Sequence, residues 1–402
     1  MKTTSASAAV GFGGRWAYTP GMSRLDVTHA MPMIKPVSGT CNLDCDYCYY
    51  RETGSYFGPP PHKMSLDTLR DVVRSFLQLP QSQVSFSWQG GEPMMAGLDF
   101  FKRVVAYQQA YARRGQSVSN MLQSNGTLID ETWCKFLHRY GFLVGISIDG
   151  PPELHNPNRN DSYDRVIRGL RLLQQHQVEH NALTLVNPLN APHPQRVYRH
   201  LRELGVDFMQ FIPCIVTGLE HDRVSTKAVD PEAFGRFLCG VFDEWVAEGD
   251  DRPYVRLFQN LLLVAAGHPP ELCIYQPRCG GCLLIEYNGD VFPCDFAVHP
   301  DWRVGNLRVS PIWRLLQHER MIQFTNLKPD LARECRECEW LSVCYGACPL
   351  TRFRDGDEPV PSYTCAGLKI FFAHAMPTIR KLAERLPGPA EADRQPGPPG
   401  AR

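Results

Sequence analysis

The chain has 402 residues, which is more than one small domain needs. With 43% hydrophobic and 21% charged residues it can bury a sizeable core, and this excludes a wholly disordered protein. Its 42 Lys and Arg residues balance 42 Asp and Glu residues, which argues against a nucleic-acid binder held mainly by phosphate contacts. The sequence contains no apolar run of about 18 residues and no greasy N-terminal signal segment. We therefore expect a cytoplasmic protein with no nucleic-acid and no membrane partner.

The first part of the chain alternates between strand-like and helix-like patterns. After a flexible leader expected over residues 1–28, the segment 29–255 carries six apolar, β-rich stretches, each followed by a stretch of helical periodicity. Strands are predicted at 31–36, 84–88, 121–124, 143–148, 182–186 and 208–212. Helices are predicted near 66–79, 98–114, 129–140, 163–177, 194–204 and 231–248. This rhythm favours an α/β fold, a partial (β/α)6 barrel similar to a TIM barrel, with its chemistry on the loops after the strands.

The segment 256–385 has a different character, with little regular structure and many cysteines. A hairpin is predicted from strands at 283–287 and 291–293 around an Asn-Gly turn. A region of this kind is typically held by metal rather than by a hydrophobic core. The Pro- and Gly-rich tail, 386–402, is expected to be disordered.

The fifteen cysteines are the most informative feature of the composition. Without an export signal, metal or redox chemistry is favoured over disulfides. Three cysteines lie close together after the first predicted strand, and nine lie between residues 273 and 365. Three isolated ones are interpreted as small buried apolar residues: Cys134, Cys214 and Cys239.

The segment CNLDCDYCYY places Cys41, Cys45 and Cys48 at positions i, i+4 and i+7. Three thiolates leave one iron of a four-iron cluster without a protein ligand, so such a cluster can bind another molecule. A zinc site, which prefers four protein ligands, is the alternative. With Tyr47 as the aromatic residue of a C-x3-C-x-aromatic-C motif, the chain resembles the radical S-adenosylmethionine (SAM) superfamily.

This resemblance implies that SAM chelates the open iron and is cleaved to a 5′-deoxyadenosyl radical. The segment QGGEP, which contains Gly91, resembles the family's GGEP motif that engages the amino group of SAM. Ser147 and Asp149, after the fourth strand, and Arg159 resemble residues that hold the carboxylate and ribose of SAM. Ile215, after the sixth strand, would contact adenine through its backbone. The cofactor-binding set implied by the resemblance is Tyr47, Gly91, Ser147, Arg159 and Ile215.

The C-terminal cysteines resemble the SPASM domain of the same superfamily, which binds two auxiliary [4Fe-4S] clusters. The resemblance implies that one cluster is held by Cys273, Cys279, Cys294 and Cys348. It implies that the other is held by Cys335, Cys338, Cys344 and Cys365. Cys282 is then left over, and a shift of one cysteine in the first set stays open. Zinc ribbons are the alternative interpretation of such paired cysteines.

Within this group the chain is most similar to the anaerobic sulfatase-maturating enzymes, through segments such as MIKPVSGTCNLDCDYCYY, SWQGGEPMMAGLDFF and GDVFPCDFAVHPDWRVGNL. These enzymes oxidise the Cβ of a cysteine or serine in an unfolded sulfatase segment to Cα-formylglycine. The resemblance implies that Asp295 is the general base. Gln89 and Tyr50 are expected by their position to face the same mouth of the barrel and to hold the substrate peptide. It also implies three [4Fe-4S] clusters, SAM, and a reducing donor such as flavodoxin or ferredoxin.

Two other functions stay open from the sequence. One is a different radical SAM/SPASM maturase that crosslinks a ribosomal peptide. The other is a module without catalysis, either an iron–sulfur electron carrier or a zinc-stabilised binding domain.

Overall fold

The computed structural model describes residues 30–215, 224, 227–353 and 358–388. The expected leader, 1–28, lies outside the described residues, as does the expected tail from residue 389 onward. Within the described ranges, no helix combines the length and the apolar character that a membrane span requires.

All six predicted strands are present and pair in parallel, in chain order. They are β1 (Met31–Ile34), β2 (Gln83–Trp88), β3 (Ser117–Ser124), β4 (Phe142–Ser147), β5 (His180–Val186) and β6 (Phe208–Pro213). A short strand, β7 (Tyr254–Val255), extends the sheet beyond β6, where it forms one edge. Because β6 pairs with β7 and not with β1, the barrel is open, and the predicted partial barrel is confirmed.

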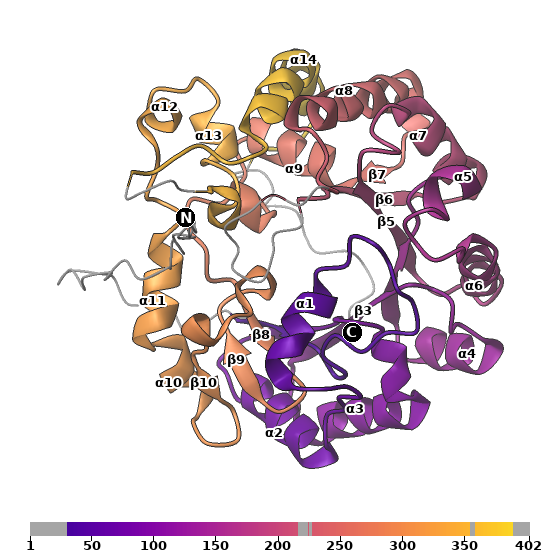
Figure 1. Ribbon diagram of the computed structural model, residues 1–402, viewed down its shortest axis with the longest axis vertical. Coiled ribbons are helices and arrows are strands. Elements are labelled where there is room, and N and C mark those ends of the chain that lie inside the picture. Colours follow the sequence, from indigo (N-terminus) through magenta and orange to yellow (C-terminus); the bar gives the residue numbers. More distant parts are fainter. Residues whose placement is uncertain (1–29, 216–223, 225–226, 354–357, 389–402) are drawn as a thin grey trace, which may run out of the picture.

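The predicted helices lie around the outside of this sheet (Figure 1). They are α2 (Leu66–Leu77), α3 (Leu98–Tyr111), α4 (Glu131–Arg139), α6 (Tyr163–Gln175), α7 (Pro194–Glu203) and α8 (Pro231–Ala247). Helix α2 shows why the periodicity was informative. Its apolar residues recur every three or four positions, and all of them except Leu66, which is 45% exposed, are buried. Ser65 caps the first turn by accepting a hydrogen bond from the backbone N–H of Thr68 at 3.1 Å. The short helices α1 (Tyr50–Gly54) and α5 (Pro152–His155) follow β1 and β4.

The cysteine-rich segment continues the sheet of the barrel. Strand β8 (Cys282–Ile285) pairs in parallel with β1, and β9 (Asp290–Phe292) and β10 (Gly305–Asn306) add antiparallel strands. The predicted hairpin is therefore present between β8 and β9. Gly289 has a φ of +88°, the left-handed conformation that the end of such a tight loop requires, and its N–H donates to the carbonyl of Glu286. The pairing of β8 with β1 holds the hairpin and the residues after it beside β1.

The last helix, α14 (Cys365–Ala383), packs against α8 and α9 (Arg256–Ala265). At the α8 contact the backbones approach closely, since a Cβ added to Gly367 would lie 1.8 Å from the carbonyl oxygen of Pro231. Phe242, Phe258 and Phe371 pack together at this junction. The hydrophobic core thus runs from the barrel into the cysteine-rich segment. The expectation that this segment lacks a substantial hydrophobic core is wrong.

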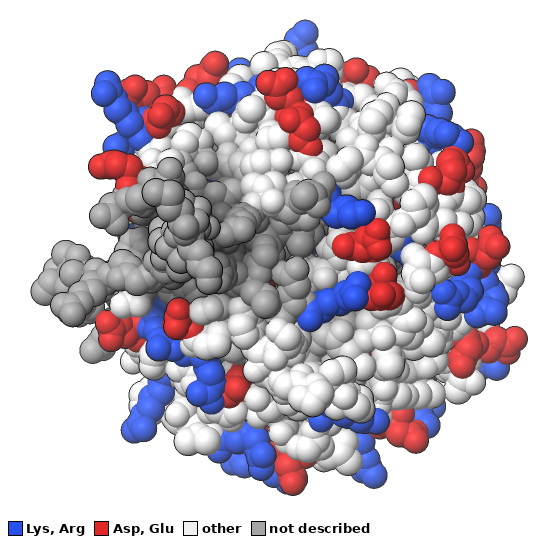
Figure 2. All heavy atoms as spheres, viewed as in Figure 1, with Lys and Arg blue, Asp and Glu red and all other residues white. Residues whose placement is uncertain are grey.

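The remaining helices of this segment are short, and the last two of them carry Cys335 and Cys344. They are α10 (Ile312–Leu316), α11 (Glu319–Asn326), α12 (Arg333–Arg336) and α13 (Leu341–Cys344). Lys and Arg side chains are interspersed with Asp and Glu over the described part of the face in Figure 2, in keeping with the balanced composition.

Candidate active site and cluster-binding loops

The three-cysteine loop follows β1 directly. Burial raises the pKa of all three thiols, to about 11 for Cys45, and each thiol also lies near another of the three. Arg159 acts in the opposite direction on Cys45 and Cys48. The Sγ of Cys41 accepts hydrogen bonds from the backbone N–H of Leu43 and the side-chain amide of Asn125. Three half-buried or buried thiols that disfavour one another's ionisation fit a positively charged metal group, which stabilises thiolates.

Among the described residues, no three His, Cys, Asp or Glu side chains converge closely enough to hold one metal ion. Thiolates that bind the separate corners of a four-iron cluster do not have to converge on a point.

The segment after β2 packs its backbone against the cysteine loop. A Cβ added to Gly91 would lie 2.0 Å from the carbonyl oxygen of Thr40, so only glycine fits there. The N–H groups of Gly91 and Glu92 donate to the carbonyls of Ser38 and Thr40 at 2.8 and 2.9 Å. Burial raises the pKa of Glu92 to about 7, although N–H groups of Asn125 and Met94 donate to its carboxylate and oppose the shift. This packing fixes the GGEP segment beside the cysteines.

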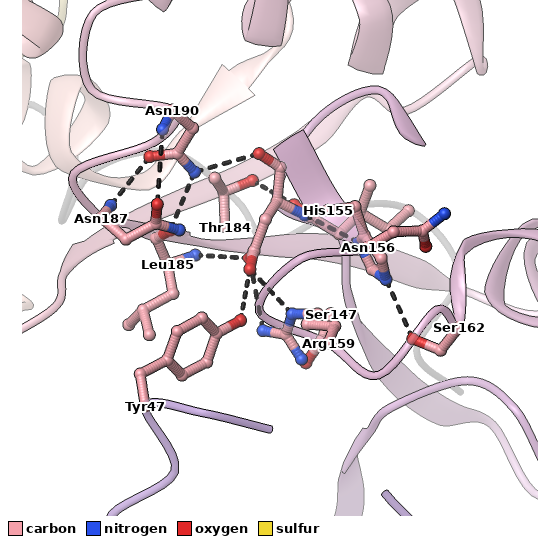
Figure 3. Close-up of polar contacts among 12 residues, drawn as sticks. Tyr47, Ser147, His155, Asn156, Arg159, Ser162, Thr184, Leu185, Asn187 and Asn190 are labelled. Atoms are coloured by element: carbon pink, nitrogen blue, oxygen red, sulfur yellow. Dashed lines mark hydrogen bonds and ion pairs between the residues drawn. The ribbon is translucent and has the colours of Figure 1, made fainter. Parts of the chain in front are cut away.

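Asp149, after β4, is the centre of a buried polar network, and its partners Tyr47, Arg159 and Leu185 are labelled in Figure 3. Its carboxylate accepts hydrogen bonds from the Nε of Arg159 at 2.9 Å, the backbone N–H of Leu185 at 3.0 Å and the hydroxyl of Tyr47. The Arg159 guanidinium also lies 5.4 Å from the centre of the Tyr47 ring. The network therefore holds a cation next to the cysteine loop and explains why an aromatic residue at position 47 is useful.

His155 connects this network to Ser162 by hydrogen bonds. Its Nδ1 accepts the backbone N–H of Asp149, so Nε2 carries the proton and donates to the hydroxyl of Ser162 (Figure 3). Burial, together with the nearby Arg159, lowers the pKa of His155 to about 4. His155 and Asn190, which donates to the carbonyl of Asp149, were not recognised from the sequence, because a lone His or Asn carries no motif.

The remaining expected SAM contacts lie at the ends of other strands. Ser147 ends β4 and accepts a hydrogen bond from Gln123 at 3.3 Å. Ile215 lies just beyond β6, next to Cys214, which is buried against Cys45 and Tyr47 of the cysteine loop. Tyr47 and Arg159 thus meet at Asp149, Gly91 packs against the backbone of Thr40, and Ser147 and Ile215 lie at the ends of β4 and β6. Of the isolated cysteines, Cys134 is also buried, whereas Cys239 is only partly so.

A second buried network surrounds Asp295. Its Oδ1 lies 2.8 Å from the Nζ of Lys35, and its Oδ2 accepts hydrogen bonds from the hydroxyls of Tyr50, at 2.7 Å, and Tyr49. Lys35 also lies 3.6 Å from Glu286, and both side chains are 1% exposed. Burial acts to lower the pKa of Lys35, but Asp295 and Glu286 outweigh it and raise the pKa. The ammonium group is therefore held charged between two carboxylates.

Gln89 directly follows β2 and lies beside the start of this network at Lys35. Its backbone N–H donates to the carbonyl of Ile34, the last residue of β1. Its side-chain Nε2 is buried and makes no hydrogen bond within the described part of the chain. A buried amide donor without a partner is costly unless another molecule accepts its proton. This position fits a residue that binds a substrate.

The eight C-terminal cysteines fall into the two expected groups in space. Burial raises the pKa of Cys294 well above its usual range and that of Cys279 to about 12, and in both cases nearby Cys348 and Cys273 contribute. Cys282 is the first residue of β8 and lies near Cys273 and Asp295. Burial raises the pKa of its thiol to about 12 as well. The first group is therefore assembled, with Cys282 at its margin.

The second group lines one cavity. All four of its members, together with Trp340 and Phe372, form the walls. The four cysteines are Cys335, Cys338, Cys344 and Cys365. A thiol-lined cavity with apolar walls fits a fully ligated iron–sulfur cluster.

Two parts of the chain match known protein families. Residues 36–201 match the radical SAM superfamily, and residues 273–339 match an iron-sulfur cluster-binding domain, SPASM. The first range begins just after β1, includes the three-cysteine loop and ends within α7. The second covers the hairpin and most of the C-terminal cysteines.

Individual proteins are similar over almost the whole chain. A serine-type anaerobic sulfatase-maturating enzyme of Bacteroides thetaiotaomicron is 36% identical over 378 residues, which is 88% of this chain and 91% of the relative. A cysteine-type anaerobic sulfatase-maturating enzyme of Clostridium perfringens is 33% identical over 363 residues, covering 88% and 98%. A solved structure described as native anSMEcpe with bound AdoMet and Cp18Cys peptide superposes with a TM-score of 0.82 at 32% identity, covering 89% of this chain and 100% of that one.

Proposed function

The chain belongs to the family of anaerobic sulfatase-maturating enzymes, in the radical SAM superfamily, and we propose that it oxidises the Cβ of a cysteine or serine in a sulfatase polypeptide to Cα-formylglycine. One observation carries this proposal. Asp295, next to Cys294, accepts hydrogen bonds from Tyr49 and Tyr50, which directly follow Cys48. A candidate base thus lies at the junction of the SAM-binding loop and the first auxiliary cluster loop.

The cofactors of this function are SAM and three [4Fe-4S] clusters, and the site geometry suggests which residues hold them. Cys41, Cys45 and Cys48 bind the cluster with the open iron. The residues proposed to contact SAM are Tyr47, Gly91, Ser147, Arg159 and Ile215. When bound, these cofactors supply hydrogen-atom abstraction from the substrate's Cβ and an acceptor for one further electron.

The auxiliary clusters are assigned to the two cysteine groups. The ligands of the first are Cys273, Cys279, Cys294 and Cys348, and those of the second are Cys335, Cys338, Cys344 and Cys365. We assign the barrel to residues 29–255 and the auxiliary-cluster domain to 256–385. The two ranges matched by the family models, 36–201 and 273–339, lie within these two parts of the chain.

Asp295 has the surroundings of a general base. Converting the thiol or hydroxyl of the substrate to a thiocarbonyl or carbonyl releases one proton, which a nearby group must accept. Lys35, Tyr49 and Tyr50 stabilise the Asp295 carboxylate as an anion, the form that accepts a proton. Tyr49 and Tyr50 also fix the direction of Oδ2, because both donate to that oxygen.

Gln89 and Tyr50 are proposed to position the substrate peptide. Gln89 has a buried amide group with no partner among the described residues, and the amide matches a backbone carbonyl of an extended peptide. Tyr50 is tied to Asp295 and lies against Lys35, whose Nζ is 4.5 Å from the ring centre. The substrate side chain would thus be held next to the base. An unfolded sulfatase segment as partner, a donor such as flavodoxin or ferredoxin and a cytoplasmic location belong to the same proposal.

The proposal is tested by incubating the anaerobically reconstituted enzyme with SAM, a reductant and sulfatase-derived peptides that carry either Cys or Ser at the target position. Mass spectrometry should show that the cysteine peptide loses hydrogen sulfide and gains an oxygen atom, or that the serine peptide loses two hydrogen atoms, and the product should react with an aldehyde-specific hydrazine. A crosslinked peptide without an aldehyde would instead support the maturase alternative. Failure to cleave SAM at all would contradict both functions.

A further inference from the structure

Lys328 is a buried cation that the mechanism above does not use. It lies between α11 and α12, and its side chain is 0% exposed. Its Nζ donates hydrogen bonds to the backbone carbonyls of Ile274 and Ala347. These carbonyls belong to the neighbours of Cys273 and Cys348, two cysteines of the first auxiliary group. The ammonium group is therefore fixed at the rim of that site.

The charge of Lys328 has no carboxylate partner among the described residues. This distinguishes it from Lys35, the other fully buried lysine, which lies between two carboxylates. Backbone carbonyls solvate an ammonium group only partly, and a buried cation without a counter-ion is strongly unfavourable. The fold therefore points to an anionic partner for this ammonium group.

Burial lowers the pKa of Lys328 to about 8, and nearby thiols of both auxiliary sites act in the opposite direction. Cys279 and Cys348 belong to the first site and Cys344 to the second. Arg352 is 5% exposed, donates to the carbonyls of Lys328 and Gly346, and adds a second positive charge at the same place. Two buried cations thus lie between the two groups of cysteines.

A four-iron cluster with four thiolate ligands carries net negative charge, and reduction adds one more electron to it. A fixed cation nearby stabilises the more negative, reduced form more than the oxidised form. We propose that Lys328 is a counter-cation shared by the two auxiliary clusters, and that its charge raises their reduction potentials. This inference rests on the auxiliary-cluster assignment in the proposed function.

The test is a potentiometric titration, followed by electron paramagnetic resonance, of reconstituted full-length chains. All chains carry Cys41→Ala, Cys45→Ala and Cys48→Ala, so that only auxiliary clusters contribute to the signal. In Lys328→Met, the ratio of reduced to oxidised cluster at a fixed potential should fall about tenfold, equivalent to a potential lowered by about 59 mV for one electron. Lys328→Arg keeps the charge and should restore most of the ratio. Lys381→Met removes an exposed lysine sixteen residues after Cys365 in α14, outside the lining of the second site, and it should shift the ratio much less.

Each outcome decides the matter. Equal ratios in the parent and in Lys328→Met, with the same iron content, would overturn the inference. Equal shifts in the Met and Arg variants would overturn it as well, because the charge would then not be the cause. If Lys328→Met fails to retain iron, retention by Lys328→Arg supports the role of the charge, and loss from both overturns it. A parent chain without about eight auxiliary irons would contradict the proposed cluster assignment itself.

Discussion

The ammonium group of Lys35 lies 2.8 Å from Oδ1 of Asp295, so a residue just after the first barrel strand fixes a carboxylate that follows the hairpin of the cysteine-rich segment. The parallel pairing of β1 with β8 brings the two residues together. The same ammonium group neutralises Glu286, which lies in the hairpin loop. The barrel and the auxiliary-cluster domain are thus joined at the proposed base by a buried ion network.

Lys35→Met should destabilise the protein strongly, because it leaves Glu286 and Asp295 as buried carboxylates without a cation. The expected loss of unfolding free energy is about 3–5 kcal/mol, measured by anaerobic denaturant titration. The double variant Lys35→Met/Glu286→Gln should recover part of the loss. Lys63→Met, at an exposed lysine, should change the stability by less than about 0.5 kcal/mol. A Lys35→Met protein as stable as this control would show that the network contributes little.

Asp295→Asn should separate SAM cleavage from product formation. The variant keeps its cysteines and should still produce 5′-deoxyadenosine, but it lacks the group that accepts the substrate proton. Aldehyde formation per deoxyadenosine, measured by chromatography and mass spectrometry, should fall by about 10²–10⁴-fold. The matched control is Asp301→Asn, at an exposed aspartate six residues further along the chain, which should keep the normal ratio. A normal ratio in Asp295→Asn would remove Asp295 from its proposed role.

The assignment of Cys279, and not Cys282, to the first auxiliary cluster gives an iron-counting prediction. Reconstituted Cys279→Ala should bind about four irons fewer than the parent, whose expected content is about twelve. Cys282→Ala should retain the full content, because Cys282 lies at the margin of the group, at the start of β8. The reverse pattern would move the ligand assignment by one cysteine.

The buried His155 makes stability depend on pH. Its pKa of about 4 in the folded chain lies below the ordinary value of 6.5, so the unfolded chain binds the extra proton between these limits. The stabilisation is complete above pH 6.5 and is lost as the pH falls toward 4, by about 3 kcal/mol in all. The charged groups that act on His155 are Arg159, Asp149 and His200, with Arg159 and His200 lowering the pKa and Asp149 raising it.

His155→Gln isolates this contribution, because a glutamine amide can accept from Asp149 and donate to Ser162 as the neutral imidazole does. Denaturant unfolding at several pH values should show a shallower decline in the variant than in the parent. His138→Gln, at an exposed histidine, should follow the parent curve. Parallel curves for the parent and His155→Gln would contradict the low pKa.

Most of the barrel could be predicted from the sequence because each strand and helix carries its own apolar period. Helix α2 and strand β2 bury the apolar residues that the spacing selected, except Leu66, which lies exposed in the first turn of α2. The three-cysteine motif was also readable, since its spacing is local, whereas the division of the later cysteines into two groups came only from the resemblance to the family. The pairing of β8 with β1 was not, because strand order depends on contacts between segments far apart in the chain.

Residues that act through distant partners could not be predicted from the sequence for the same reason. Lys35, Glu286 and Lys328 belong to no motif, and a lysine is normally expected at the surface. Their burial becomes visible only once the barrel and the hairpin are assembled around them. The contact of Tyr49 with Asp295 could not be predicted for a different reason, because Tyr49 follows the cysteine motif without belonging to it.

The central claim is that the cluster on Cys41, Cys45 and Cys48 keeps one iron free for SAM. Electron–nuclear double resonance on the reduced enzyme, mixed with SAM isotopically labelled in its amino group, tests this directly. We predict a coupling between the labelled nitrogen and the cluster that disappears in the Cys41→Ala variant. A reduced cluster that shows no such coupling, and whose fourth iron is instead bound by a side chain of the protein, would contradict the account.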